Sequence, residues 1–297
     1  MLLGDSLKAA VERLSAAKVP SPRMNAELLL MFALNCDRAH LYAHPERELT
    51  SGETSRYDEA LAKRAAGIPA QYITGHQEFW GMDFIVSPAV LIPRPETEHV
   101  IETVLPLARP LVRPRIVDVG TGSGCIALAL QIELPEAEIH ATDISGEALE
   151  IAQVNAARLS AVHRAGRSGD TLTSLSTGTH RTIYFHQTDL LDGFDPNSFD
   201  LVVSNPPYVG ECEADQVQFE VRKFEPRQAV FAGATGMELI SRLIPQAQRI
   251  LKPGGWLVIE ISGTVVKQVE AELKGWASVS VAKDLQQIPR VVAARNA

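Results

Sequence analysis

The sequence has few of the features that mark disulfide-bonded, metal-binding or membrane proteins. Its three cysteines, Cys36, Cys125 and Cys212, lie far apart and form no C-x-x-C pair. We therefore expect no metal site and no disulfide framework, as suits a reducing cytoplasm. The longest apolar run, residues 28–34, is much shorter than the roughly 20 residues that span a bilayer. The N-terminus also lacks a basic stretch followed by an apolar one, so we expect a cytoplasmic protein without a membrane anchor.

Positive charge is scarce as well. The chain has 28 Lys and Arg against 36 Asp and Glu, a formal net charge of -8. This argues against a general polyanion binder, because a sequence-independent grip on phosphates needs a surplus of basic residues, but it leaves room for a local basic patch. The composition, 45% hydrophobic and 22% charged, is that of an ordinary globular protein. A length of 297 residues suits one large and one small domain better than a single core.

The first quarter of the chain has a helical pattern. Apolar residues recur at three- and four-residue spacing between residues 6 and 67, and Thr50 and Glu53 have the spacing of a capping box. Residues 70–92 then change to β-rich residues around a W-G-M turn, which indicates a hairpin. We therefore expect a helical domain over 1–69, a linking β-hairpin over 70–92 and a second domain over 93–297.

Strands and helices alternate from residue 115 onward. The expected strands are 115–120, 137–144, 182–190, 199–205, 255–262, 277–285 and 290–296. Apolar strands separated by helices indicate an α/β fold with a mostly parallel sheet covered on both faces. Ligands of such sheets bind at the carboxyl ends of the strands. The Ser/Thr/Gly-rich segment 160–180 interrupts the pattern and is interpreted as a surface loop.

A glycine-rich turn, "GTGSG", follows the first of these strands. Gly120, Gly122 and Gly124 allow a sharp turn and bring backbone N–H groups close to a ligand, although glycine also serves purely structural turns. Dinucleotide folds favour G-x-G-x-x-G, whereas here Cys125 takes the place of the last glycine. A pyrophosphate cradle is therefore disfavoured, and Cys125 is interpreted as a small packing residue.

Acidic residues end three of the expected strands. Asp143 can accept hydrogen bonds from both hydroxyls of a ribose, Asp118 could bind a ligand or only orient the glycine turn, and Asp189 ends the third strand. Carboxylates around one pocket suit a cationic nucleoside and repel phosphates. S-adenosyl-L-methionine, with its ribose, adenine and sulfonium, fits that description.

The stretch "FDLVVSNPPYVGE" places two prolines directly after a strand, which fixes the backbone in a stiff corner. A planar nitrogen is a poor nucleophile because its lone pair is delocalised, so a site that methylates it must hold both N–H groups. The Asn205 side-chain oxygen and the Pro206 carbonyl, stiffened by Pro207, can be the two acceptors. Tyr208 offers a flat wall for the substrate. The alternative is an ordinary turn.

"GTGSG", Asp143 and "SNPPY" together resemble the class I S-adenosylmethionine-dependent methyltransferases that modify planar nitrogens. "EFWGMDFIVSPAVLIPRPETE" narrows the resemblance to the glutamine N5-methyltransferases of peptide chain release factors, the PrmC/HemK family. It covers nearly the whole chain, including "RKFEPRQAVFAG" and "IPRVVAAR". It implies a Rossmann-like, mostly parallel seven-stranded sheet that ends in an antiparallel hairpin, with a helical N-terminal bundle joined by a β-hairpin. The segment 160–180 is longer than the usual connection.

The resemblance also implies an activity. It is methylation of the glutamine N5 in the Gly-Gly-Gln motif of class 1 release factors, with the helical domain docking the substrate protein. The implied catalytic residues are Asn205, Pro206, Pro207 and Tyr208. The implied cofactor-binding residues are Asp118, Gly120, Thr121, Gly122, Ser123, Gly124, Asp143, Asp189, Leu190 and Asn205. We expect a monomer that binds neither nucleic acid nor membrane. Because "NPPY" is shared with adenine N6 and guanine N2 enzymes, nucleic-acid amine methylation is the alternative.

Overall fold

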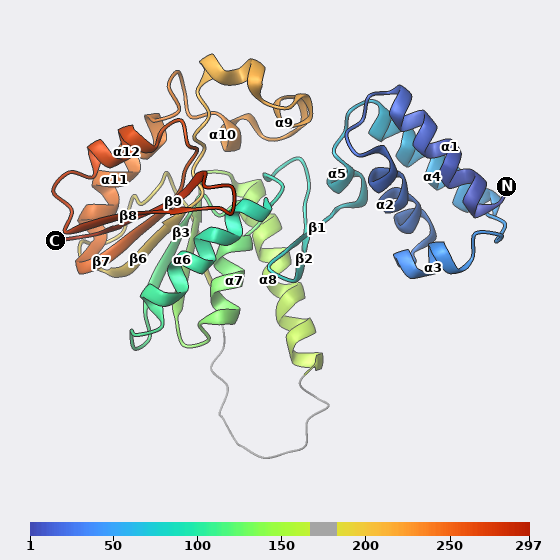
Figure 1. Ribbon diagram of the computed structural model, residues 1–297. Coiled ribbons are helices and arrows are strands. Elements are labelled where there is room, and N and C mark those ends of the chain that lie inside the picture. Colours follow the sequence, from blue (N-terminus) through green and yellow to red (C-terminus); the bar gives the residue numbers. More distant parts are fainter. Residues whose placement is uncertain (167–182) are drawn as a thin grey trace. The chain divides into compact units, whose positions relative to one another are not determined.

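The computed structural model describes residues 1–166 and 183–297, which divide into two compact units (Figure 1). The first unit comprises Met1–His76 and Gln218–Phe224, and the second comprises Gln77–Val217 and Glu225–Ala297. The helical part therefore extends past the expected boundary at residue 69. It also includes a segment from the second half of the sequence, which periodicity alone did not assign to it.

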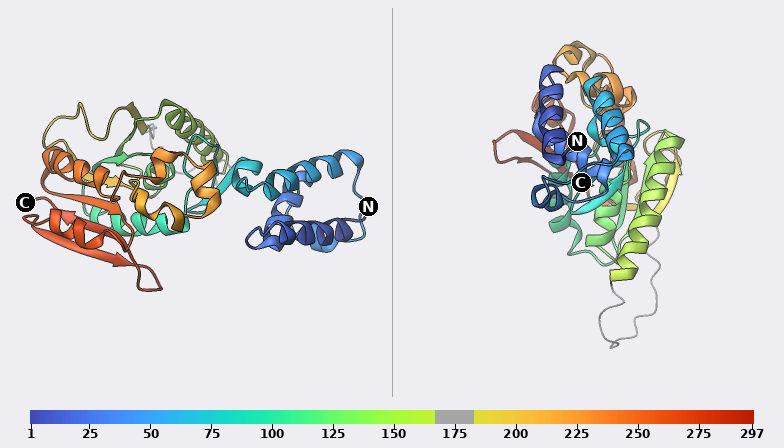
Figure 2. Two further views of the ribbon diagram at one scale, coloured as in Figure 1. Left: turned by 90° about the horizontal axis from the view of Figure 1, so that it is seen from above. Right: turned by 90° about the vertical axis from the view of Figure 1, so that its right-hand side faces the viewer.

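The first unit is helical. Its elements are α1 (Leu3–Ala16), α2 (Pro22–Leu34), α3 (Arg38–Ala43), α4 (Ser51–Ala65), α5 (Ala70–Thr74) and α9 (Phe219–Phe224). Helices α1, α2 and α4 lie side by side around a core that includes Leu14, Leu30 and Leu61 (Figure 2). The predicted capping box at the start of α4 is confirmed. The Glu53 N–H donates to Thr50 Oγ1 at 3.3 Å, and the Thr50 N–H donates to Glu53 Oε2 at 2.9 Å.

The second unit is built on a seven-stranded sheet of order β5-β4-β3-β6-β7-β9-β8. The strands are β3 (Arg115–Val119), β4 (Glu138–Asp143), β5 (Ile183–Gln187), β6 (Phe199–Ser204), β7 (Leu251–Glu260), β8 (Ser278–Lys283) and β9 (Pro289–Arg295). The pairs β5/β4, β4/β3, β3/β6 and β6/β7 are parallel, while β9 is antiparallel to β7 and β8. The predicted α/β fold class, with its closing antiparallel hairpin, is confirmed.

Helices cover both faces of this sheet, as expected for strands that are apolar on both sides (Figure 1). Alternate residues of β3 point to opposite faces of the sheet and belong to different hydrophobic cores. Ile116 packs with α6, α7 and α8, whereas Val117 packs with α11 and α12. The helices are η1 (Pro95–Thr97), α6 (Glu98–Ala108), α7 (Cys125–Glu133), α8 (Gly146–Gly166), η3 (Glu211–Gln216), α10 (Arg227–Val230), α11 (Glu238–Ile250) and α12 (Val266–Glu272). A separate hairpin is formed by β1 (His76–Phe79) and β2 (Met82–Ile85).

The expected surface loop over 160–180 is partly wrong. Helix α8 continues to Gly166, because Ala161, Arg164 and Ala165 favour a helix. The remainder of that loop, from residue 167, lies outside the described residues. Within the described part of the chain, we find no helix that combines the length and apolar character needed to cross a bilayer.

Candidate active site

A cavity of about 400 Å³ lies at the carboxyl ends of β3, β4 and β6, where a parallel sheet is expected to bind its ligand. Four short segments carry most of the predicted site residues that line it. These are Gly120–Ser123 after β3, Thr142–Ser145 around the end of β4, Asp189–Leu190 after β5 and Ser204–Pro207 at the end of β6. The sheet therefore brings together residues that are up to about 90 positions apart in the sequence, because parallel strands end at one edge.

The glycine turn opens toward this cavity. Gly120 and Gly122 have φ of +70° and +55°, and a Cβ added at either residue would meet no atom within 4 Å. The two glycines thus leave a cradle in which a ligand can approach the backbone. Gly124 differs, because its added Cβ would lie 3.2 Å from Ala152 Cβ and from Leu128 Cδ1. It does not line the cavity, and its expected contact with the cofactor is replaced by close packing between helices.

Asp118 is buried next to the glycine turn and is hydrogen-bonded to it. Its Oδ2 accepts a hydrogen bond from Thr121 Oγ1 at 2.6 Å and from the Ala127 N–H at 3.2 Å. Burial raises the pKa of the Asp118 carboxyl to about 7, although these two hydrogen bonds act to lower it. The residue is fully buried and is absent from the cavity wall. The expectation of direct cofactor contact by Asp118 is therefore corrected: it orients the turn.

Asp143, the last residue of β4, does line the cavity. Its Oδ2 accepts from the Gly122 N–H and its Oδ1 from the Ser145 N–H, both at 2.9 Å. Burial raises the pKa of the Asp143 carboxyl, and these backbone hydrogen bonds act to lower it. Each carboxylate oxygen has a second lone pair, so the carboxyl is fixed in direction while it can still accept from a ligand hydroxyl.

Asp189 and Leu190 form another part of the wall. Asp189 Oδ2 pairs with Arg242 Nη2 at 2.5 Å near the surface. Leu190 is 7% exposed and has φ of +51°, which is uncommon for a residue with a branched side chain. Its carbonyl accepts from the buried Thr142 Oγ1 at 3.0 Å, which ties this corner to the end of β4. A strained apolar residue held in this way gives the cavity a fixed apolar surface.

The Asn205–Tyr208 motif follows β6 directly. Asn205, Pro206 and Pro207 line the cavity, and Asn205 Nδ2 donates to Thr97 Oγ1 at 3.0 Å. Tyr208 does not line it. The residue is half-buried, its ring packs against the core that includes residues of α11 and α12, and its hydroxyl donates to Glu260 Oε1 at 3.0 Å. The flat wall expected from Tyr208 stays a prediction.

Sequence reasoning missed part of the cavity wall. Arg94 lines the cavity and forms an ion pair with Glu225, whose side chain is 1% exposed. Glu225 Oε2 also accepts from the Ile92 N–H at 3.2 Å. Gln228 and Phe231 follow on the same segment and line the cavity too. The prolines beside Arg94 and Glu225 mark stiff turns, but a single sequence contains no signal that pairs two such distant turns.

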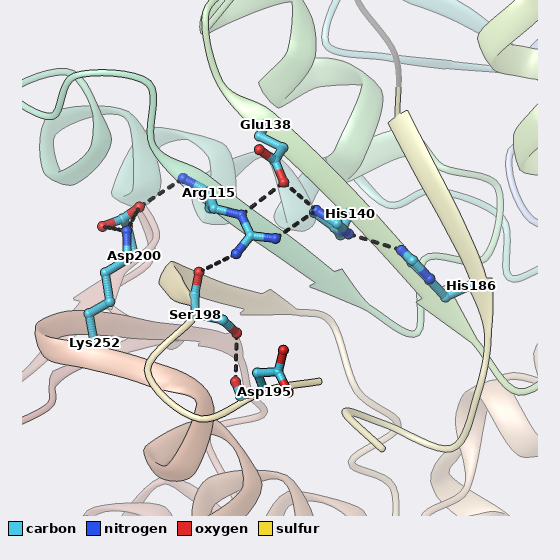
Figure 3. A network of polar contacts seen from close by, with 8 residues as sticks. All are labelled: Arg115, Glu138, His140, His186, Asp195, Ser198, Asp200 and Lys252. Atoms are coloured by element: carbon cyan, nitrogen blue, oxygen red, sulfur yellow. Dashed lines mark hydrogen bonds and ion pairs between the residues drawn. The ribbon is translucent and has the colours of Figure 1, made fainter. Parts of the chain in front are cut away.

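A second polar network begins at the amino ends of β3 and β4 and extends to His186 on β5 (Figure 3). Arg115 Nε donates to Glu138 Oε1 at 2.8 Å, and His140 Nε2 lies 2.9 Å from the same oxygen. His140 Nδ1 lies 2.9 Å from His186 Nε2. Because the Glu138 contact at 2.9 Å is closer than that of Arg115 Nη2 at 3.5 Å, we assign His140 Nε2 as a donor to Glu138 and Nδ1 as the acceptor from His186. Burial lowers the pKa of both imidazoles.

Known proteins resemble this chain along its whole length. Residues 5–75 match the family model of the PrmC N-terminal domain, and residues 100–221 match that of the methyltransferase small domain. The release factor glutamine methyltransferase of Koribacter versatilis (strain Ellin345) is 54% identical over 297 residues, which are 100% of this chain and 99% of the relative. That of Moorella thermoacetica is 39% identical over 287 residues, covering 96% and 95% of the two chains.

A solved structure supports the fold. The hMettl16 catalytic domain, in complex with MAT2A 3'UTR hairpin 6, is similar with a TM-score of 0.53 and 18% identity. The match covers 80% of this chain and 81% of that one, and at this identity it shows the fold alone. The high identity over full length to the curated relatives goes further. The chain belongs to the release factor glutamine methyltransferase family.

Proposed function

We propose that this protein methylates the side-chain amide nitrogen, N5, of the glutamine in the Gly-Gly-Gln motif of class 1 peptide chain release factors, with S-adenosyl-L-methionine as methyl donor. One observation carries the proposal. Asn205 and Pro206, which can hold a planar N–H group, line the same cavity as Gly120, Gly122 and Asp143. The names of the relatives supply the substrate class.

The residues of the cavity fit the cofactor. Gly120 and Gly122 leave open space for a ligand against the backbone, Asp143 can accept from ribose hydroxyls, and Leu190 offers an apolar surface to adenine. The Asp143 carboxylate, with which no cation pairs among the described residues, favours a ligand with positive charge, whereas the charge of Asp189 is balanced by Arg242. When bound, S-adenosyl-L-methionine supplies an electrophilic methyl group on a sulfonium. The protein's own task is to present the amide nitrogen to that carbon.

Asn205 and Pro206 present the nitrogen by accepting hydrogen bonds from its two N–H groups. The lone pair of an amide nitrogen is delocalised, so it becomes a useful nucleophile only when it is aimed along the S–CH₃ bond. The Asn205 Oδ1 and the Pro206 carbonyl accept the two N–H groups and fix that direction. The electron pair of the broken S–C bond would stay with the bound cofactor as a thioether, and the nitrogen would lose its proton only after the N–C bond has formed. No base is needed at the start, because an amide is too weak an acid near neutral pH.

Three finer features belong to the same proposal. The helical unit docks the release factor, the protein acts as a monomer in the cytoplasm, and it takes neither nucleic acid nor membrane as partner. The formal charge of -8 supports a protein substrate over a polyanion. The separate helical core supports a docking role, because it leaves the wall of the cavity to the other unit.

The proposal is tested by incubation with S-adenosyl-L-methionine labelled on its methyl group. Parallel reactions contain a class 1 release factor, the same factor with the Gly-Gly-Gln glutamine replaced by alanine, RNA, and DNA. We expect label only in the first, located on that glutamine by peptide mass spectrometry, and labelling slowed by about 10²–10³ with Asn205→Ala as enzyme. Label in RNA or DNA alone would replace the proposal with the exocyclic-amine alternative.

A further inference from the structure

A tight turn after β5 places Leu190 in the wall of the cavity. The Asp192 N–H donates to the Asp189 carbonyl at 3.1 Å, which closes a four-residue turn. The central peptide of this turn joins Leu190 to Leu191. Leu190 is the second residue of the turn and has φ of +51°, a conformation for which turns favour glycine, asparagine or aspartate. A leucine in this place is strained, so the surrounding structure must hold it there.

Two side chains from different elements hold that central peptide. Its carbonyl, which belongs to Leu190, accepts from the buried Thr142 Oγ1 near the end of β4 at 3.0 Å. Its N–H, which belongs to Leu191, donates to Gln246 Oε1 on α11 at 3.0 Å. Because a peptide unit is planar, its carbonyl and its N–H rotate together, and any rotation would break both hydrogen bonds. The peptide is therefore fixed on both of its sides.

Helix α11 presents a row of polar side chains to this turn and to the chain that follows it. Arg242, Gln246 and Arg249 are spaced by four and three residues, which places them on one side of the helix. Arg242 pairs with Asp189 at the start of the turn, and Arg249 Nη1 donates to the Phe194 carbonyl at 2.8 Å. Gln246 lies between these two contacts. Among the described residues, Arg242 lines the cavity and Gln246 does not, so Gln246 can act on a ligand only through the turn.

We propose that Gln246 is a positioning residue for the cofactor, which fixes the central peptide of the turn and thereby holds the Leu190 side chain against the adenine. The inference rests on the function proposed above, because it takes S-adenosyl-L-methionine as the ligand of the cavity. Without Gln246 the turn is free to leave the left-handed conformation, which is unfavourable for a residue with a Cβ. Only part of the molecules then offers the Leu190 surface, and the apparent affinity falls by that fraction.

Gln246→Met tests the proposal, because methionine has nearly the length of glutamine but no oxygen to accept the Leu191 N–H. We expect the dissociation constant of S-adenosylhomocysteine, measured by calorimetry, to rise about tenfold, the effect of losing one orienting hydrogen bond. Deuterium exchange of the Leu191 amide should become faster in the cofactor-free protein. Gln246→Glu keeps an acceptor and should bind within about threefold of the unaltered chain. Gln248→Met, at an exposed position of the same helix, is the matched control and should change neither measurement.

A double variant separates positioning from general support of the fold. Leu190→Gly removes the apolar side chain and relieves the strain, so Gln246→Met added to it should raise the dissociation constant by less than about threefold. A further rise of about tenfold in that background would overturn the inference, as would an unchanged dissociation constant in Gln246→Met alone.

Thermal unfolding identifies a variant that fails to fold. If Gln246→Met does so, Gln246→Asn replaces it under the same two criteria, because its shorter side chain withdraws the oxygen from the Leu191 N–H. An unaltered chain that binds S-adenosylhomocysteine but leaves the release-factor glutamine unmethylated would refute the proposed substrate instead. The calorimetry would then still decide the role of Gln246, because it requires no methyl acceptor.

Discussion

Substitution of Gly236 should displace the backbone of the Asn205–Tyr208 motif without changing any residue of the motif itself. This glycine has φ of +85°, and an added Cβ would lie 2.4 Å from the Tyr208 carbonyl oxygen and 3.0 Å from the Gly210 nitrogen. Ordinary contacts of a Cβ begin at 3.4 Å. In Gly236→Ala the two backbones must therefore separate by about 1 Å, and the movement acts on a corner that two prolines make stiff.

Two costs follow. The left-handed conformation of a residue with a Cβ costs about 1–2 kcal/mol of folding free energy. A misplacement of about 1 Å at a reacting centre lowers the rate about 100-fold. We therefore expect Gly236→Ala to lower the single-turnover rate of methyl transfer by about 10². Urea unfolding should show a loss of stability somewhat above the backbone cost, because the displaced corner adds to it.

Gly275→Ala is the matched control. Gly275 has φ of +100°, and an added Cβ meets no atom within 4 Å. It therefore carries the same kind of backbone strain without a clash near the cavity. We expect a loss of stability of about 1–2 kcal/mol and an unaltered transfer rate. A Gly236→Ala enzyme with a rate within threefold of the unaltered chain, or an equal loss of rate in both variants, would refute the reasoning.

Three further predictions follow from the site and from the polar network. Asn205→Ala should lower the transfer rate by about 10²–10³, the effect of losing one preorganised polar group, while calorimetry shows little change in cofactor affinity; near-normal turnover would remove Asn205 from its role. Asp143→Ala should weaken cofactor binding about 10- to 100-fold, the loss of a charged hydrogen-bond acceptor, and unchanged affinity would contradict this. The lowered pKa values of His140 and His186 predict that their stabilising contribution is present above pH 6.5 and is lost as the pH falls below it, because the unfolded chain then binds more protons. The urea midpoint of His186→Gln should therefore fall less steeply between pH 7 and 5 than that of the unaltered chain, and equal slopes would disprove the role of this pair.

The spacing of apolar residues and the residues at turns were sufficient to predict the fold class. Each strand expected from residue 115 onward is present, because strands buried on both faces are marked by apolar runs that helices separate. Residues of the glycine turn, Asp143 and Asn205 line one cavity because each follows or ends a parallel strand, and their roles toward cofactor and substrate stay predictions. Local sequence was therefore a good guide wherever a strand end alone determines where a side chain points.

The remaining features depend on contacts between distant segments. Asp118 was assigned to the ligand, but it turns inward to a buried partner, Thr121, which local sequence does not specify. Nor does local sequence specify that the Tyr208 hydroxyl bonds to Glu260. The pairing of Glu225 with Arg94 likewise joins two distant turns. The direction of a side chain at a loop is decided by such tertiary partners, so one sequence without relatives cannot provide it.

The assignment of α9 to the helical unit has a practical consequence for dissecting the enzyme. Gly67 lies so close to Phe219 that an added Cβ would come within 2.8 Å of its ring, and Arg64 Nη2 pairs with Glu220 Oε1 at 2.5 Å. A truncated chain that begins at Gln77 would thus keep α9 but lose the residues that cover it. A single cut cannot yield two well-behaved fragments; residues 218–224 would have to be replaced by a short polar linker as well.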